Sequence, residues 1–381
     1  MTPAPAQAAS ARDQQIATRI GFFIGGFGVS AWAPLVPYAK ARLGLEDGTL
    51  GLLLLCLGAG SLLTMPLTGP AAARFGCRKV LVVAAAALCL TLPFLTILDD
   101  ALSLGTALFL FGGAVGSVDC VINIQAVMVE KASGRPMMSG FHGLFSLGGI
   151  AGAGGVSLLL MAGLSPSAVA LAVVAILITA LLRAKAGFLP YGAEGQGPIF
   201  AIPRGAVLFI GVLCFVAFLT EGAMLDWSAV FLTSLRRLDP SRAGMAYACF
   251  AGAMTAGRLT GDAIVRSFGP LKVVAVGGVL AAGGLATAIA ASSWIAGLIG
   301  FALVGAGCSN IVPVLYTAVG RQDDMPDHIA VPAISTLGYA GILAGPAAIG
   351  FVAHSLGLTA ALLIVAVMMT GVSLSTRWLK A

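Results

Sequence analysis

Long apolar runs alternate along the chain with short polar breaks that contain Gly, Pro and charged residues. Most runs are about 18–25 residues long, the length that an α-helix needs to cross roughly 30 Å of hydrocarbon. With turn residues and charges as boundaries, the pattern predicts an all-α polytopic membrane protein with twelve transmembrane helices. We expect these helices near residues 17–38, 48–72, 79–98, 101–129, 137–162, 166–184, 205–233, 242–265, 271–290, 293–318, 328–353 and 357–377.

The second half of the chain repeats features of the first. GPAAARFGCRK at 69–79 ends the second predicted span, and GDAIVRSFGPLK at 261–272 ends the eighth, 192 positions later. SLGGIAG at 146–152 is echoed by TLGYAGI at 336–342. Such repeats are typical of secondary transporters, whose site lies between the halves near the midplane. We predict an N-terminal six-helix half over 1–184, a cytoplasmic connecting loop over 185–204 and a C-terminal six-helix half over 205–381.

Composition excludes a soluble protein, because only 9% of the residues are charged and the mean hydropathy is +1.02, against about 25% charged residues in soluble domains. The basic residues lie mainly in loops on one side of the predicted spans, 15 of 21 against 5 on the other side, with Arg258 inside a span. The positive-inside bias therefore predicts that both termini are cytoplasmic. The basic residues form no patch with interleaved aromatic residues, so we expect no nucleic-acid partner.

Motifs for enzymatic chemistry are absent from the sequence. It has no phosphate-binding loop of the G-x-x-x-x-G-K-[ST] type, no H-E-x-x-H and no G-x-S-x-G. The seven cysteines are scattered without a metal-binding spacing. We therefore expect no enzyme activity, no cofactor and no metal, and transport driven by an ion gradient or by the substrate's own gradient. The expected partners are a small-molecule substrate, protons and the lipid bilayer, with the chain as a monomer.

The stretch from Gly69 to Lys79 resembles the major facilitator superfamily signature G-x-x-x-D-R-x-G-R-K. Ala73 stands in place of the signature's Asp, which leaves the partner of this cytoplasmic gate open. An acid in the fourth span and EGAMLDW at 221–227 are similar to a bacterial, fucose-permease-like branch. The resemblance implies the twelve-helix fold, alternating access, a location in the bacterial inner membrane and gate roles for the signature residues Arg74 and Arg78.

Asp119 lies in the middle of the fourth predicted span, four residues before Asn123 on nearly the same helix face. An acid at a helix centre costs about 2.5–3.5 kcal/mol on insertion scales and usually marks an ion or substrate path. Asp119 is therefore our main candidate for proton coupling, and the resemblance supports this role. Asn123 is a candidate substrate ligand. The alternative is that Asp119 bonds to a neighbouring helix purely for packing.

The seventh and eighth spans carry four further charged groups. Glu221 is a candidate for either proton coupling or a structural role. Asp226 lies nearer the outer surface, where a salt bridge to Arg236, Arg237 or Arg242 is the favoured interpretation. Depths counted along the helices disfavour Glu221 as the partner of Arg258. We therefore expect a cytoplasmic gate formed by Arg258, Asp262 and Arg266.

Polar residues in other spans are candidate substrate ligands, each with a structural alternative. Trp32 can stack on a substrate or anchor the chain at the outer interface, and the interface is favoured. Asn310 lies close to Pro313, which can bend its helix and free a carbonyl group. His142 can titrate or serve as a structural donor. The remaining candidates form a hydroxyl face in the eleventh span: Ser335, Thr336 and Tyr339.

Together these features predict a secondary active transporter, proton-coupled, for a sugar-like or other neutral polar solute. Proton-driven efflux of amphiphilic or cationic drugs and metabolites is the alternative within transport. A non-transporting membrane receptor or scaffold is the alternative from another class.

Overall fold

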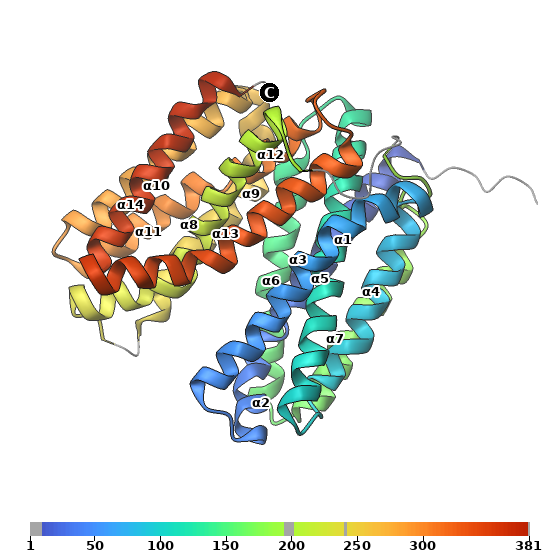
Figure 1. The fold of residues 1–381 in the computed structure, drawn as a ribbon, viewed down its shortest axis with the longest axis horizontal. Helices are drawn as coiled ribbons and strands as arrows, with labels where there is room; N and C mark the ends of the chain where they lie inside the picture. The colour runs from blue at the N-terminus through green and yellow to red at the C-terminus, as the bar shows by residue number, and fades with distance from the viewer. Residues whose placement is uncertain (1–9, 194–201, 240–241, 380–381) are drawn as a thin grey trace, which may run out of the picture. The chain divides into compact units, whose positions relative to one another are not determined.

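The computed structural model describes residues 10–193, 202–239 and 242–379, and the regular elements in these ranges are all helices (Figure 1). The N-terminal residues 1–9, and residues 194–201 of the predicted connecting loop, lie outside the described residues. The chain divides into two compact units. The first comprises residues 1–64, 68–134 and 144–193, and the second comprises 65–67, 135–143 and 194–381. The predicted half boundaries at 184 and 205 stay predictions.

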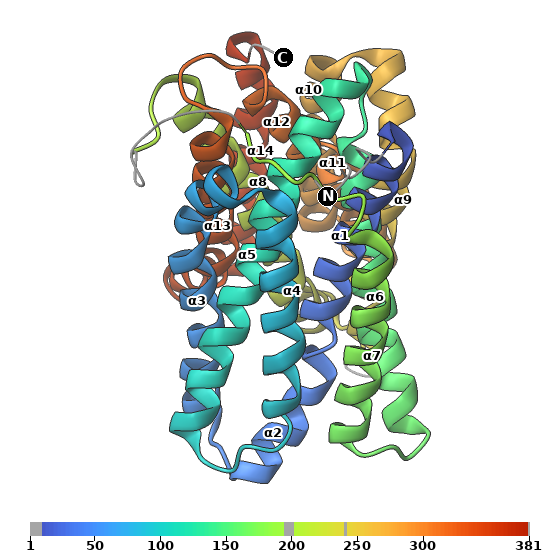
Figure 2. The ribbon, with the colours of Figure 1, turned by 90° about the vertical axis from the view of Figure 1, so that its right-hand side faces the viewer.

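The first unit is organised around α5, which is buried at almost every position over residues 111–130. α5 packs against α1 and α4, and Figure 2 shows α4 alongside it. It also approaches α3 closely, because Ser61 Oγ donates to the carbonyl of Gly112 at 2.7 Å, and a Cβ on Gly112 would lie 1.9 Å from the Leu57 oxygen. Its helices are α1 (Ala11–Ser30), α2 (Val36–Leu43), α3 (Asp47–Phe75), α4 (Cys77–Phe94), α5 (Ala101–Ser133), the greater part of α6 (Met138–Met161) and α7 (Pro166–Ala184).

In the second unit, α8 packs along α13, α9 packs on α11, and α10 packs against both α11 and α14 (Figure 1). The first residues of α6 also belong to this unit. Its other helices are α8 (Gly205–Arg236), α9 (Gly244–Phe268), α10 (Pro270–Ala290), α11 (Trp294–Cys308), α12 (Ile311–Val319), α13 (Asp327–Leu356) and α14 (Leu358–Ser375).

The described helices supply the twelve predicted spans. Eleven are long and apolar enough to cross a membrane, counting α1 with α2 and α11 with α12 as single spans. The twelfth, α9, has 25 residues and falls short in apolarity, because Arg258 and Asp262 lie within it. Two spans are interrupted where the sequence carries proline: the first at Ala33–Leu35 and the tenth between Cys308 and Ile311.

Both copies of the repeated signature end at a glycine that joins two helices. Gly76 ends α3 and begins α4 with φ +84°, and Gly269 ends α9 and begins α10 with φ +83°. Only glycine adopts such a conformation without strain. At Gly76 a Cβ would also lie 2.1 Å from the Pro190 oxygen, so the segment after α7 packs directly on this turn.

A second repeated feature was not predicted from the sequence. Arg42, at the end of the first span, donates to the carbonyls of Leu95, Thr96 and Leu98 at 3.0, 2.6 and 2.9 Å, beyond the end of α4. Arg236, at the end of the seventh span, donates to Ala288 and Ile289 at the end of α10. In each unit, an arginine at the end of that unit's first span thus donates to carbonyls at a helix end, which have no intrahelical partners.

We predict that Arg42→Ala lowers the free energy of unfolding by about 1.5 kcal/mol, because three carbonyls lose a charged donor. Arg42→Lys is expected to recover less than half of this loss, since an ammonium group lacks the planar fork of a guanidinium. Thermal unfolding of the purified protein in detergent measures both changes. Full recovery by Arg42→Lys would mean that only charge matters at this position.

Candidate functional site

Asp119 and Asn123 lie on α5 inside the first unit. Asp119 is 9% exposed, and its carboxylate has no hydrogen bond or ion pair within the described residues. Asn123 is fully buried and donates from Nδ2 to the backbone oxygen of Asp119 at 2.9 Å. Its Oδ1 has no hydrogen-bond partner there. An unsatisfied buried acceptor costs about 1–3 kcal/mol, so both side chains keep acceptor capacity for a proton or a donor group.

Trp32 lies where α1 gives way to the short helical turn Ala33–Leu35. The indole ring is 4% exposed, and its Nε1 has no hydrogen-bond partner in the described part of the chain. Protein therefore encloses the ring, and the interpretation of Trp32 as an interfacial anchor stays a prediction. The first span continues through α2 to Leu43, so Trp32 does not lie at its end. Its N–H is a donor that points into the protein.

In the second unit, Arg258 of α9 pairs with Glu221 of α8. The Nη2 to Oε1 distance is 3.0 Å, and the side chains are 5% and 12% exposed. The expectation that Glu221 lies too deep to reach Arg258 was wrong. Depth counted as rise per residue ignores helix tilt and the length of both side chains, which together close the gap.

The interruption of the tenth span supplies another partner for Arg258. α11 ends at Cys308 and α12 begins at Ile311, as the position of Pro313 predicted. Pro313 has no N–H to offer the carbonyl four residues earlier, which belongs to Ser309. That carbonyl accepts a bond from Arg258 Nε at 3.3 Å. The pair and the helix break therefore form one connected polar cluster.

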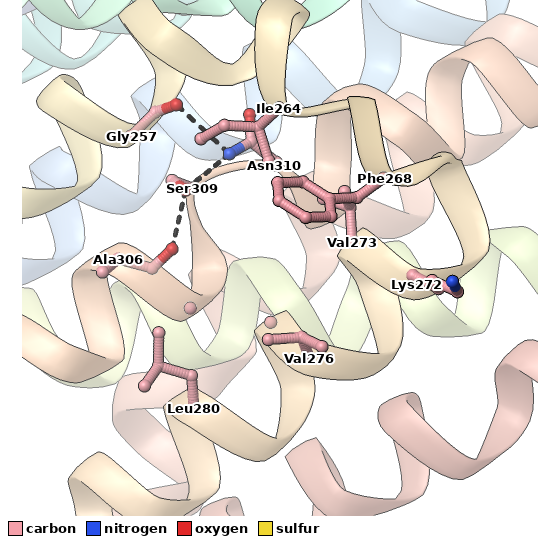
Figure 3. Close-up of a pocket in the computed structure, with 12 residues that line it drawn as sticks. Gly257, Ile264, Phe268, Lys272, Val273, Val276, Leu280, Ala306, Ser309 and Asn310 are labelled. Carbon is pink, nitrogen blue, oxygen red and sulfur yellow. Dashed lines mark hydrogen bonds between the residues drawn. The ribbon is translucent and has the colours of Figure 1, made fainter. Parts of the chain in front are cut away.

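Asn310 completes this cluster (Figure 3). Its Nδ2 donates to the Gly257 carbonyl at 3.1 Å and to Ser309 Oγ at 2.9 Å. Its Oδ1 is buried without a hydrogen-bond partner among the described residues. Gly257 lies one position before Arg258, so α9 contacts the break through both its backbone and its guanidinium.

The predicted hydroxyl face of the eleventh span is not a single surface. Ser335 Oγ lies 2.6 Å from Tyr316 Oη, and the Tyr316 ring is 5.5 Å from that of His142. Thr336 instead donates to its own helix at the carbonyl of Pro332, at 2.7 Å. The ring of Tyr339 lies 6.4 Å from that of Phe218. Ser335 and His142 thus meet through Tyr316, a fully buried residue that the sequence analysis did not single out.

The gate candidates of the first signature bond to backbone groups. Arg78 donates to the carbonyls of Phe188 and Ala186 at 2.9 and 2.7 Å, in the segment that follows α7. Carbonyl oxygens are thus acceptors for this signature arginine in a chain that has Ala73 in place of the Asp. Arg74 is exposed and lies over the ring of Phe75, with 5.2 Å between the guanidinium carbon and the ring centroid.

The gate candidates of the second unit are placed differently from one another. Asp262 accepts a hydrogen bond from the Gly140 N–H at 3.0 Å, at the start of α6. Arg266 is exposed in the last turn of α9. Asp226 is exposed and has no ion pair within the described residues. The favoured salt bridge to Arg236, Arg237 or Arg242 was therefore wrong for the described residues, and Arg236 bonds instead to the carbonyls at the end of α10.

Gln125 is the clearest residue that the sequence analysis missed. It is fully buried, donates to Thr18 Oγ1 at 2.9 Å and accepts from the Leu189 N–H at 3.1 Å. It therefore ties α5 to α1 and to the segment after α7. An amide inside an apolar run needs partners, and this signal in the sequence was available at position 125.

Residues 19–322 match the family model of the Major Facilitator Superfamily. The chain belongs to this superfamily. An uncharacterized MFS-type transporter of Yersinia pestis is 56% identical over 365 residues, 96% of this chain and 95% of that protein. The membrane protein MosC of Rhizobium meliloti is 30% identical over 350 residues, 90% of this chain and 84% of MosC. The protein is thus a multi-pass membrane transporter and not an enzyme.

The MFS fold is supported by solved structures as well. FucP in its outward conformation matches with a TM-score of 0.82 over 96% of this chain and 98% of FucP, at 16% identity. FucP is the fucose:proton symporter of E. coli. At this identity the likeness concerns the fold alone.

We predict that Arg258→Met destabilises the transporter by about 3–5 kcal/mol, because it leaves the Glu221 carboxylate buried without its partner. The double variant Glu221→Met/Arg258→Met is expected to be more stable than Arg258→Met alone, since no unpaired charge remains. Thermal unfolding of both variants and of Glu221→Met completes the double-mutant cycle. The matched control is Arg266→Met, the same change at an exposed position of α9, which should stay within about 0.5 kcal/mol. If the two single substitutions changed the free energy of unfolding additively, the interaction between Glu221 and Arg258 would be contradicted.

Proposed function

We propose that this transporter moves a small neutral polar solute, such as a sugar-like compound, together with protons, and that Asp119 binds the proton. The observation that carries the proposal is the Asp119 carboxylate, which lies inside a span without a donor or cation among the described residues. An ionisable side chain inside a span usually marks an ion or substrate path. Asp119 can therefore load and release a proton during the transport cycle.

The polar groups without partners support a hydroxylated, uncharged substrate. Trp32 Nε1 is a donor, whereas Asn123 Oδ1 and Asn310 Oδ1 are acceptors. A hydroxyl group both donates and accepts, so a polyol or sugar suits each of these atoms. Arg258 is already paired with Glu221, which leaves no unneutralised cation at this cluster for an anionic substrate. That FucP is a fucose:proton symporter is consistent with this choice.

Glu221 is proposed as a second group that responds to protons. Its carboxylate and the Ser309 carbonyl bond to the same guanidinium. Protonation of Glu221 would neutralise its carboxylate and weaken its bond to Arg258, while the carbonyl of Ser309 at the break of the tenth span stays an acceptor for the same guanidinium. A local loss of charge of this kind can shift the equilibrium between two conformations of the transporter.

The proposed location is the bacterial inner membrane, with both termini in the cytoplasm and the protein acting as a monomer. The distribution of basic residues supports this orientation.

The test is a thermal-shift screen of the purified protein with sugars, polyols, nucleosides, amino acids and organic cations at about pH 5.5 and about pH 7.5, between which the proton concentration differs about a hundredfold. We predict that one sugar or polyol raises the unfolding temperature more at the lower pH, since proton and substrate binding are linked. Asp119→Asn should still bind this ligand but lose the pH dependence. Asp119→Asn should also abolish ligand-driven proton uptake into proteoliposomes.

The control is Asp99→Asn, which removes an exposed acid from the loop before α5 and should keep both responses. Equal pH dependence in Asp119→Asn and wild type would remove Asp119 from the mechanism. Stabilisation only by organic cations would instead support drug or metabolite efflux. A ligand that binds without any solute crossing the membrane would support a receptor.

A further inference from the structure

A pocket of about 430 Å³ lies in the second unit among α9, α10 and α11 (Figure 3). Its volume falls within the range of about 300–1,000 Å³ typical of small-molecule sites. The walls are mainly apolar, with Ile264, Phe268, Val276, Leu280 and Ala306 among them. Cavities with apolar walls do not hold ordered water, so an apolar ligand suits this pocket.

The pocket opens on a surface that hydrocarbon surrounds. Phe268 and Val276, two of its lining residues, are 65% and 63% exposed. α10, which carries Val276, is one of the spans long and apolar enough to cross a membrane. In a bilayer the molecules that touch such a surface are lipid acyl chains, and exposed side chains of this size are otherwise unfavourable in water.

One end of the pocket is basic. Lys272 is exposed, lines the pocket and has no ion pair within the described residues. It lies in the first turn of α10, whose N-terminus adds partial positive charge, and Arg266 occupies the last turn of the preceding helix. Leu280 lies eight residues further along α10, about 12 Å by helix rise, and Figure 3 shows it at the opposite end of the lining. The pocket is therefore cationic at one end and apolar at the other.

We propose that this pocket binds one acyl chain of an anionic phospholipid, whose headgroup phosphate pairs with Lys272. Basic pockets between transmembrane helices on the cytoplasmic side bind anionic headgroups, and the distribution of basic residues assigns the N-terminal end of α10, where Lys272 lies, to that side. Ser309 and Asn310 form part of the pocket wall, so the bound chain contacts the break in the tenth span. A lipid at this position stabilises the broken helix from its lipid-facing side.

The test uses the purified, delipidated full chain with four separate probes: dioleoyl phosphatidylglycerol, dioleoyl phosphatidylcholine, oleate and inorganic phosphate. Native mass spectrometry measures retention, and thermal unfolding measures stabilisation. We predict that phosphatidylglycerol is retained and stabilises the protein more than the other probes. Lys272→Gln should weaken its binding about fivefold, the effect of one basic residue at an anionic lipid surface. Ala306→Phe, which fills the pocket, should remove the retained molecule.

Lys79→Gln is the matched control, because Lys79 ends the first copy of the signature as Lys272 ends the second, and lies outside this pocket. If Ala306→Phe fails to fold, Val276→Trp at the exposed rim replaces it. Equal effects of Lys79→Gln and Lys272→Gln would overturn the proposal, since they indicate general surface attraction. Equal retention of phosphatidylcholine, or stabilisation by phosphate alone, would overturn it as well. Unchanged retention in both pocket-filling variants would show that no chain enters the pocket.

Discussion

The guanidinium of Arg258 imposes the strongest constraint on the second unit. Within a membrane, polar groups must find their partners inside the protein, because lipid offers none. Arg258 is 4% exposed and bonds to the Glu221 carboxylate and to the Ser309 carbonyl. The first bond fixes α9 beside α8. The second requires that the Ser309 carbonyl accept no hydrogen bond from its own helix. Pro313 provides it by removing an intrahelical N–H donor. The broken tenth span and the buried arginine therefore depend on each other.

The same requirement explains three other arginines at helix ends. Arg42, Arg78 and Arg236 each donate to backbone carbonyls that terminate a helix or follow it. A guanidinium with several donors in a fixed fork suits two or three carbonyls at once. This explains how the first signature remains connected with Ala73 in place of its Asp. Arg78 holds the segment after α7 through Ala186 and Phe188, so its charge is directed to the backbone.

Much of the fold was predictable from the sequence, because span length and apolarity follow directly from the thickness of the bilayer. The break near Pro313 was predictable as well, since proline has a fixed local effect. The partners of charged side chains were less predictable. Counting rise per residue placed Glu221 too far from Arg258. The error arises from helix tilt and side-chain length, which become visible only in three dimensions. The arginines at helix ends were missed because their acceptors are carbonyls, which every residue has.

A few buried polar atoms lack a hydrogen-bond partner within the described residues, and they include Arg236 Nε and His328 Nδ1 as well as atoms of the candidate site. Asp119, the Oδ1 atoms of Asn123 and Asn310, and Trp32 Nε1 have no hydrogen-bond partner within the described residues. Close to these atoms in the chain or in the cluster, Gln125, Ser309 and Arg258 do have partners. A sequence that supplies partners for Gln125 can supply them for Asn123 two positions away, so the lack of partners is local. Groups that must exchange a proton or a solute cannot be saturated by the protein itself, since a permanent partner would compete with the ligand. The unsatisfied atoms of α5 and of the break in the tenth span are therefore the groups that we propose take part in the transport cycle.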